Sequence, residues 1–144
     1  KGKAELLKLL ISKGGAANNG ELFIHAININ NTDITKILID NGCNVNYKDV
    51  KQNNLLHISG LKQKTAIARL FIATKKININ ENNDVGDSPL HLVVSNGKNL
   101  ELCQIYVAAG ADVNARNSIG KIVYKVAKGS KVKKYLKSNG AKKK

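Results

Sequence analysis

The stretch DSPLHLVVSNG, residues 87–97, holds the only proline of this 144-residue chain and, two residues later, one of its three histidines. Such a histidine has two interpretations: a general base beside a nucleophile, or a structural residue in a helix that the proline begins. Proline fits the first turn of a helix, and Ser88 before it can act as an N-cap. His91 can then hydrogen-bond Ser88 or nearby loop backbone. We therefore expect a structural role for His91, and for His57 in the similar stretch LLHIS.

The surroundings of this stretch recur along the chain. GCNVN at 42–46, KININ at 76–80 and GADVN at 110–114 start 34 residues apart, as do His57 and His91. Between these markers, the segments TKILIDNG, ARLFIATK and CQIYVAAG each place apolar residues on one helical face. Repetition at this period is typical of stacked repeat units. Each unit is therefore predicted to contain a short helix, a connection, a longer helix and an extended hairpin loop.

This pattern resembles that of the ankyrin repeat family, in which Thr-Pro-Leu-His begins a unit and Gly-Ala-Asp-Val-Asn closes it. SPLH at 88–91 and GADVN at 110–114 match closely, and NLLH at 54–57 keeps the Leu and the His. In the first copy Phe23 takes the Leu place and Ile24 the His place, which leaves His25 out of phase. The resemblance implies an all-α ankyrin-repeat solenoid of stacked helix-turn-helix units with hairpin loops.

The whole chain, 1–144, is expected to form one such domain. Its expected parts are a partial N-terminal unit at 1–19, repeats at 20–52, 53–86 and 87–120, and a C-terminal capping unit at 121–144. Because only 4% of the residues are aromatic and Trp is absent, we expect a core of Leu, Ile, Val and Ala rather than of large rings. The residues expected to fill the layer between units are Leu38, Leu70, Ile105 and Val107, with Ala26, Ser59 and Gly60 letting the first helices approach closely.

Asn46, Asn80 and Asn114 close the three markers, and we expect their side chains to hydrogen-bond loop backbone. The resemblance also implies Asn114 as a candidate for hydroxylation, which occurs in some members of the family. Cys43 and Cys103 are too few for a disulfide framework and lack the spacing of a zinc site. We expect both to be free thiols in an intracellular compartment, cytoplasmic or nuclear. Secretion into a host cell is the alternative if the source is a pathogen.

The formal net charge of +14 is concentrated at one end. Residues 121–144 contain ten lysines and no acidic residue, whereas the first 120 residues hold 14 basic and 10 acidic ones. Lysine outnumbers arginine 22 to 2, although forked recognition of phosphate favours arginine. One interpretation is a solvated lysine-rich face. The other is a patch, Lys121 to Lys144, that binds an acidic protein, nucleic acid or anionic lipid.

Motifs that carry chemistry are absent. The sequence has no Gly-rich phosphate loop, HExxH helix, paired CxxC or GxSxG elbow, and no apolar run approaches the ~20 residues that cross a bilayer. Asp84 and Asp87 flank Gly86, where a polar turn is the ordinary explanation. We therefore predict no enzyme, cofactor, metal or small-molecule substrate.

The resemblance implies that partners bind to a concave face formed by hairpin tips and first helices. Among the predicted binding residues, Val50, Leu61, Val85 and Ile119 are apolar where the frame does not need it. The full set is Tyr47, Val50, Lys51, Asn53, Leu61, Lys62, Asp84, Val85, Asp87, Ser95, Asn96, Ser118, Ile119 and Lys121. The predicted function is that of a monomeric adaptor or scaffold that binds a protein on this face. The alternative is an electrostatic binder of nucleic acid or anionic membrane through the lysine-rich C-terminal unit.

Overall fold

The computed structural model describes residues 5, 7, 9, 11, 12 and 19–144. The partial unit expected at 1–19 lies mostly outside the described residues. From residue 19 onward the chain forms eight helices, in the order α2 (Asn19–Asn28), α3 (Thr32–Asp40), α4 (Leu55–Leu61), α5 (Thr65–Ala73), α6 (Pro89–Asn96), α7 (Leu100–Ala108), α8 (Val123–Val126) and α9 (Ser130–Ser138).

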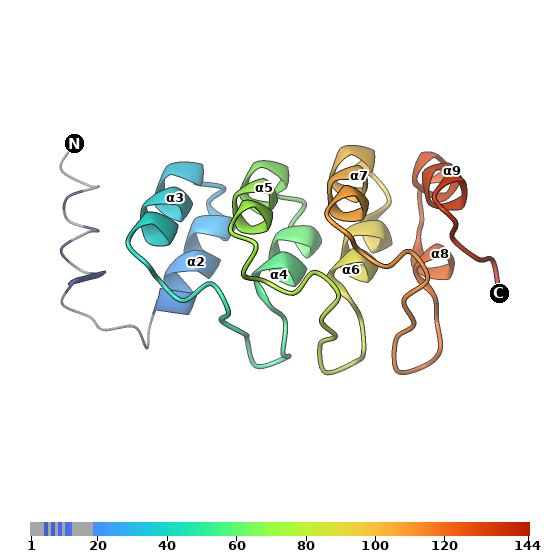
Figure 1. Cartoon of the computed structure of the whole chain (residues 1–144), viewed down its shortest axis with the longest axis horizontal. Helices are drawn as coiled ribbons and strands as arrows, with labels where there is room; N and C mark the ends of the chain where they lie inside the picture. The colour runs from blue at the N-terminus through green and yellow to red at the C-terminus, as the bar shows by residue number, and fades with distance from the viewer. Residues whose placement is uncertain (1–4, 6, 8, 10, 13–18) are drawn as a thin grey trace.

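The helices lie in two rows along a stack (Figure 1). Helices α2, α4, α6 and α8 contact one another in that order, and α3, α5, α7 and α9 form the second row. The loops that join one pair to the next project as long hairpins on one side of the stack (Figure 1). This arrangement is the all-α solenoid that the repeat pattern predicts.

Polar residues before the helices explain where several of them begin. The side-chain oxygen of Asn31 accepts from the Ile34 N–H at 2.9 Å, which caps α3. Asn99 caps α7 through the Leu102 N–H in the same way, and Asn54 caps α4 by accepting from two backbone N–H groups. These bonds satisfy donors that a helix start leaves free. Helix α6 instead begins with Pro89, which needs no partner for its nitrogen.

The core contains large rings, and the expectation that it would hold none is wrong. Tyr106, Phe23 and Phe71 are fully buried. The two phenylalanine rings meet edge to face, with centroids 5.5 Å apart. The Tyr106 hydroxyl donates to the Leu56 carbonyl oxygen at 2.7 Å and lies 3.1 Å from Ser59 Oγ. Burial is possible because the hydroxyl has these partners, and it raises the pKa of the Tyr106 phenol far above its usual value.

Helix α7 also faces the core differently from the expectation. Ile105 and Val107 are only half-buried, whereas Leu102, Cys103 and Tyr106 are buried. In α5, Leu70 is likewise half-buried beside the fully buried Phe71. Apolar residues lie on several sides of these helices, so the sequence alone does not identify the side that packs inward. Leu38 is fully buried, as are the small residues Ala26 and Ser59 on the first helices.

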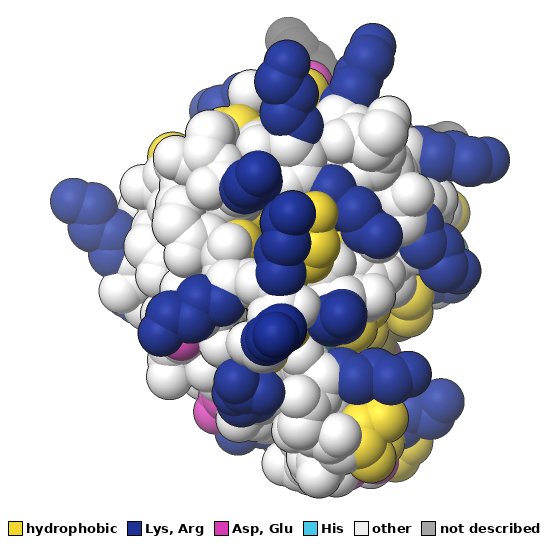
Figure 2. Space-filling view, turned by 90° about the vertical axis from the view of Figure 1, so that its right-hand side faces the viewer, with side chains coloured by type: hydrophobic (Ala, Val, Ile, Leu, Met, Phe, Trp, Pro, Cys, Tyr) yellow, Lys and Arg dark blue, Asp and Glu magenta, His cyan; other side chains and the backbone are white. Residues whose placement is uncertain are grey.

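The charge of the molecule is unevenly placed on its surface. Figure 2 views the end of the stack that carries the C-terminal unit, and lysine and arginine side chains spread over most of this face. Acidic side chains lie only near its edge in this view. The lysine-rich segment is thus a face of the solenoid rather than a separate domain.

Candidate functional site

The three hairpins share one turn geometry. In the first, the Asp49 N–H donates to the Asn53 carbonyl oxygen and the Gln52 N–H donates back to the Asp49 carbonyl oxygen. The same pair of bonds recurs around Asn83 and around Asn117. The fourth residue of each tip has a positive φ: 59° at Gln52, and 76° and 73° at the glycines that follow in the second and third hairpins. Three tips of one shape therefore present their side chains alike.

The tips are also bonded to one another. The Asp84 N–H of the second tip donates to the Lys51 carbonyl oxygen of the first at 3.0 Å. The Ser118 N–H of the third tip donates to the Val85 carbonyl oxygen of the second at 3.1 Å. These backbone bonds join the three tips into one row. We call residues 49–52, 83–86 and 117–120 the tip row.

Side-chain bonds at the base of the tips reinforce the row. Asn83 Nδ2 donates to Asn53 Oδ1 at 2.8 Å, and Asn117 Nδ2 donates to Asp87 Oδ1 at 2.9 Å. Asn53 also donates to the carboxylate of Asp49 at 3.0 Å. A loop held by so many bonds starts with little conformational freedom to lose on binding.

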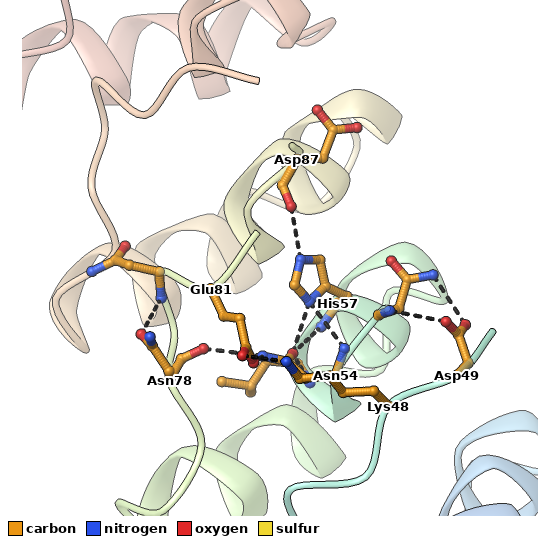
Figure 3. A network of polar contacts seen from close by, with 10 residues as sticks. Lys48, Asp49, Asn54, His57, Asn78, Glu81 and Asp87 are labelled. Atoms are coloured by element: carbon orange, nitrogen blue, oxygen red, sulfur yellow. Dashed lines mark hydrogen bonds and ion pairs between the residues drawn. The ribbon is translucent and has the colours of Figure 1, made fainter. Parts of the chain in front are cut away.

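His57 ties its own helix start to the next unit (Figure 3). The Asn54 N–H donates to Nδ1 at 3.2 Å, so that nitrogen is the acceptor and the proton lies on Nε2. Nε2 in turn donates to the Asp87 carbonyl oxygen at 2.8 Å. Burial lowers the pKa of His57 below its usual value, which keeps the ring neutral at pH 7.

His91 repeats this arrangement one unit later. The Ser88 N–H donates to Nδ1 at 3.1 Å, and Nε2 donates to the Lys121 carbonyl oxygen at 3.1 Å. Both rings are buried and bonded at each nitrogen. His91 Nδ1 also lies 2.9 Å from the Oγ of Ser88, a hydroxyl that is itself buried at the start of α6. The structural role expected for them is confirmed. His25 is exposed, in agreement with its place out of phase.

A second polar tie lies beside His57 (Figure 3). Asn54 Nδ2 donates to the Asn78 carbonyl oxygen at 3.0 Å and to Glu81 Oε2 at 3.1 Å. Lys48 forms an ion pair with the same carboxylate. Burial raises the pKa of the Glu81 carboxyl, but the hydrogen bonds from Lys48 and Asn54 outweigh burial and lower it below its usual value. The first hairpin is therefore fixed to the second unit at its base.

The asparagines at the ends of the markers bridge consecutive units. Asn80 donates to the Gly110 carbonyl oxygen at 2.9 Å and accepts from the Asp112 N–H at 2.8 Å. Asn114 does the same with the Gly140 carbonyl oxygen and the Lys142 N–H. The expected backbone bonds are confirmed for these two residues.

Ten of the fourteen predicted binding residues are exposed, and the other four are buried or half-buried. Asn53 is only 7% exposed and its side chain holds the tips together, so it is not available to a partner. Tyr47 is half-buried, and its ring lies so close to Gly20 that no side chain would fit there. Asp87, also half-buried, uses its carboxylate on Asn117. Ser95 is half-buried as well. The exposed members are Val50, Lys51, Leu61, Lys62, Asp84, Val85, Asn96, Ser118, Ile119 and Lys121.

Several of the predicted residues come together around one shallow groove. This hollow of about 280 Å³ lies between the first two tips and the helices α4 and α6. Sequence reasoning missed Leu92, which continues the apolar wall, and Asn83. The residues around the groove are Lys51, Asn53, Leu61, Asn83, Asp84, Val85, Asp87 and Leu92.

The tip row carries three large hydrophobic side chains that are exposed to solvent. Val50 is 96% exposed, Ile119 73% and Val85 55%. The turn bonds place Val85 and Ile119 at the same position of their tips, where the first tip has Lys51, and Val50 stands one residue earlier. Exposed apolar groups at loop tips are not needed for packing. They favour contact with another apolar surface.

A larger hollow of about 490 Å³ lies between α5 and α7. The Arg69 guanidinium and the Glu101 carboxylate lie 3.1 Å apart beside it and pair with each other. The smaller groove is the better candidate for binding because it includes the exposed tip residues.

The described residues offer little for catalysis. They contain no group of three or more His, Cys, Asp or Glu side chains that could hold a metal ion. In the same part of the chain no helix is long and apolar enough to cross a membrane. Cys43 and Cys103 are buried free thiols, as expected. Burial raises the pKa of the Cys103 thiol to about 11, so it is not a reactive thiolate.

Comparison with known proteins agrees with the geometry. The family profile described as "Ankyrin repeats (3 copies)" matches residues 1–83 and 22–117. Alpha-latrotoxin-Lg1a of Latrodectus geometricus is 30% identical over 81% of this chain and 9% of the toxin. The putative ankyrin repeat protein R96 of Acanthamoeba polyphaga mimivirus is 31% identical over 78% of this chain and 11% of its own length.

A third relative is the nuclear factor NF-kappa-B p105 subunit of Gallus gallus, 31% identical over 58% of this chain and 9% of that protein. The chain therefore spans only about a tenth of the length of these relatives. Ankyrin repeats generally mediate protein–protein interaction, and the family is generally non-enzymatic. The chain belongs to the ankyrin repeat family.

Proposed function

We propose that this chain is a non-enzymatic docking module that binds one protein partner along the tip row and the adjoining groove. The observation that carries the proposal is the exposure of Val85 and Ile119 at equivalent positions of tips that backbone bonds join into one row. A rigid apolar stripe of this kind suits the centre of a protein interface.

The polar neighbours suit the rim of such an interface. Lys51 and Asp84 line the groove together with Val85, and Lys62, which follows the lining residue Leu61 in the chain, is exposed. Charged groups at a rim tune recognition and association rate more than they add affinity. We therefore infer that the partner contributes apolar side chains to the stripe and groove, and that the module acts as a monomer.

The test is affinity capture with the 144-residue chain as bait, washed at about 0.5 M salt to screen long-range charge attraction. The variants are Val85→Asp and Ile119→Asp. Ile29→Asp is the matched control, since Ile29 is also an exposed apolar residue, 50% accessible, but lies in the α2–α3 connection away from the tips.

We expect a stoichiometric protein that survives the wash, is lost with both tip variants and is kept by Ile29→Asp. All three variants should remain folded, because the substituted side chains are exposed. A partner that binds the two tip variants as well as the parent would refute the proposal.

A further inference from the structure

The closing unit carries lysines at positions that inner units use for stacking. Counted from the start of the first helix in each unit, Lys125 of α8 holds the place of the buried histidines His57 and His91. Counted from the start of the second helix, Lys133 of α9 holds the place of Ala68 and Cys103, which are fully buried. The side that is covered in inner units therefore presents ammonium groups here.

Helix α9 adds three more lysines on its outer side. Val132 and Leu136 pack inward, and Lys131, Lys134 and Lys137 follow at intervals of three residues on the remaining surface. All three are exposed. We call the surface formed by the lysines of residues 123–144 the basic end face; it lies at the end of the stack that Figure 2 shows.

The need for solubility does not by itself explain a surface on which all the charges are positive. A stack end needs only a polar face, and mixed charges serve that purpose without a strong field. In the preceding units, two basic side chains pair with carboxylates: Lys48 with Glu81 and Arg69 with Glu101. Helix α9 has no acidic residue in its first turn and carries Lys131 there. Like charges three or four residues apart and a cation at a helix start both cost stability.

The composition of the basic end face indicates the kind of partner. It has no arginine, and its two aromatic residues, Tyr124 and Tyr135, are half-buried; Lys133 lies over the Tyr124 ring at 5.7 Å. No large hydrophobic residue of this segment is exposed. Base stacking and forked base contacts are thus not provided. Lysine point charges spread over a whole face, rather than along one line, match a plane of phosphate groups.

We propose that the basic end face docks this module on an anionic phospholipid surface. The contact is electrostatic and peripheral, since no described helix can cross the bilayer. The end face and the tip row lie on different sides of the stack (Figures 1 and 2). Lipid binding therefore leaves the tips accessible, and the proposal goes beyond the protein-docking function without depending on it.

The experiment is co-sedimentation of the 144-residue chain with two kinds of vesicle at roughly 0.1 M salt. One kind contains phosphatidylcholine alone, and in the other about a third of the lipid is phosphatidylserine. The test variant replaces Lys131, Lys134 and Lys137 with Gln. The matched control replaces Lys36, Lys51 and Lys62 with Gln, which removes the same charge from exposed sites outside residues 121–144. Circular dichroism confirms that both remain folded, and duplex DNA and single-stranded RNA are added as competitors.

We expect binding to the phosphatidylserine vesicles alone, a loss of affinity of roughly a hundredfold in the test variant, and at most a fewfold loss in the control. Three results would overturn the proposal: no binding to anionic vesicles, equal losses in both variants, or a preference for nucleic acid that displaces the chain from vesicles at equal phosphate concentration. The second result would reduce the effect to net charge, and the third would assign the face to nucleic acid.

Discussion

The unit of α6 and α7 and the closing unit of α8 and α9 hold different residues at equivalent places. His91 is fully buried and donates to the carbonyl of the next unit, whereas Lys125 at the same place is exposed. Helix α6 has eight residues and α8 only four. The comparison teaches that burial at these positions is created by the following unit, since each unit of a solenoid contacts only its neighbours. A position's role therefore depends on its place in the stack as well as in the repeat.

The largest expected effect comes from removing a histidine tie. His57→Ala should lower the free energy of unfolding by about 3 kcal/mol, because it opens a cavity, leaves the Asn54 N–H without a partner and removes one of the two hydrogen bonds to the Asp87 carbonyl oxygen. Lys125→Ala, at the equivalent place in the closing unit, should change it by less than about 0.5 kcal/mol. Urea unfolding followed by circular dichroism measures both, and equal losses would contradict the comparison.

The same tie should make the stack sensitive to acid. The pKa of His57 is lowered by burial from its ordinary value of 6.5, so below that pH the unfolded chain binds more protons than the folded one. We expect stability to fall as the pH drops below 6.5 and to be unaffected by this group above it. The free energy of unfolding should therefore differ less between about pH 7.5 and about pH 5 for His57→Asn than for the parent chain. His25→Gln, at an exposed site, should keep the parent's difference.

Two glycines at equivalent places, Gly86 in the second tip and Gly120 in the third, differ in what surrounds them. A side chain on Gly86 would place Cβ 2.4 Å from the backbone nitrogen of Ser118, whereas nothing lies within 4 Å at Gly120. Both have positive φ. We expect Gly86→Ala to cost roughly 2 to 3 kcal/mol, from strain plus a clash with the next tip, and Gly120→Ala about 1 kcal/mol from strain alone. Similar shifts in the unfolding midpoint would show that the tips do not touch.

The smallest effect is a gain at the first tip. Gln52 has a φ of 59° where the later tips have glycine, and a side chain costs energy in this conformation. Gln52→Gly should raise the free energy of unfolding by about 0.5 kcal/mol, since part of the relieved strain is offset by the greater freedom of the unfolded chain. Gln52→Ala keeps the backbone strain and should give no gain. A loss with glycine would mean that the Gln52 side chain has a stabilising contact.

Much of the fold could be predicted from the sequence, because the signals are local and repeated. The 34-residue spacing of His57 and His91 and the proline at a helix start identified the units, and the burial of both histidines agrees. The side of α7 that packs inward could not be predicted, since Ile105, Tyr106 and Val107 are all apolar enough to be buried. Only the neighbouring helices decide it.

The candidate site was predictable in outline for a similar reason. Tip residues follow from the repeat position, but the burial of Asn53 depends on Asp49 and Asn83, which come from two hairpins. The backbone bonds between tips leave no trace in residue types, because any residue except proline can donate from its N–H. Leu92 was missed because it becomes part of a groove only together with the residues of the first two hairpins that line the same hollow.

The central claim is that the tip row is a preformed surface, ordered by contacts between units before any partner binds. Amide hydrogen exchange of the free chain, read by nuclear magnetic resonance at Asp84 and Ser118, tests it most directly, since these two N–H groups bond the preceding tips. We predict that both exchange far more slowly than in an unstructured peptide, and that Gly86→Ala accelerates Ser118 much more than the amides of α6. Exchange of Asp84 and Ser118 at unstructured rates, with the helices still protected, would contradict the account.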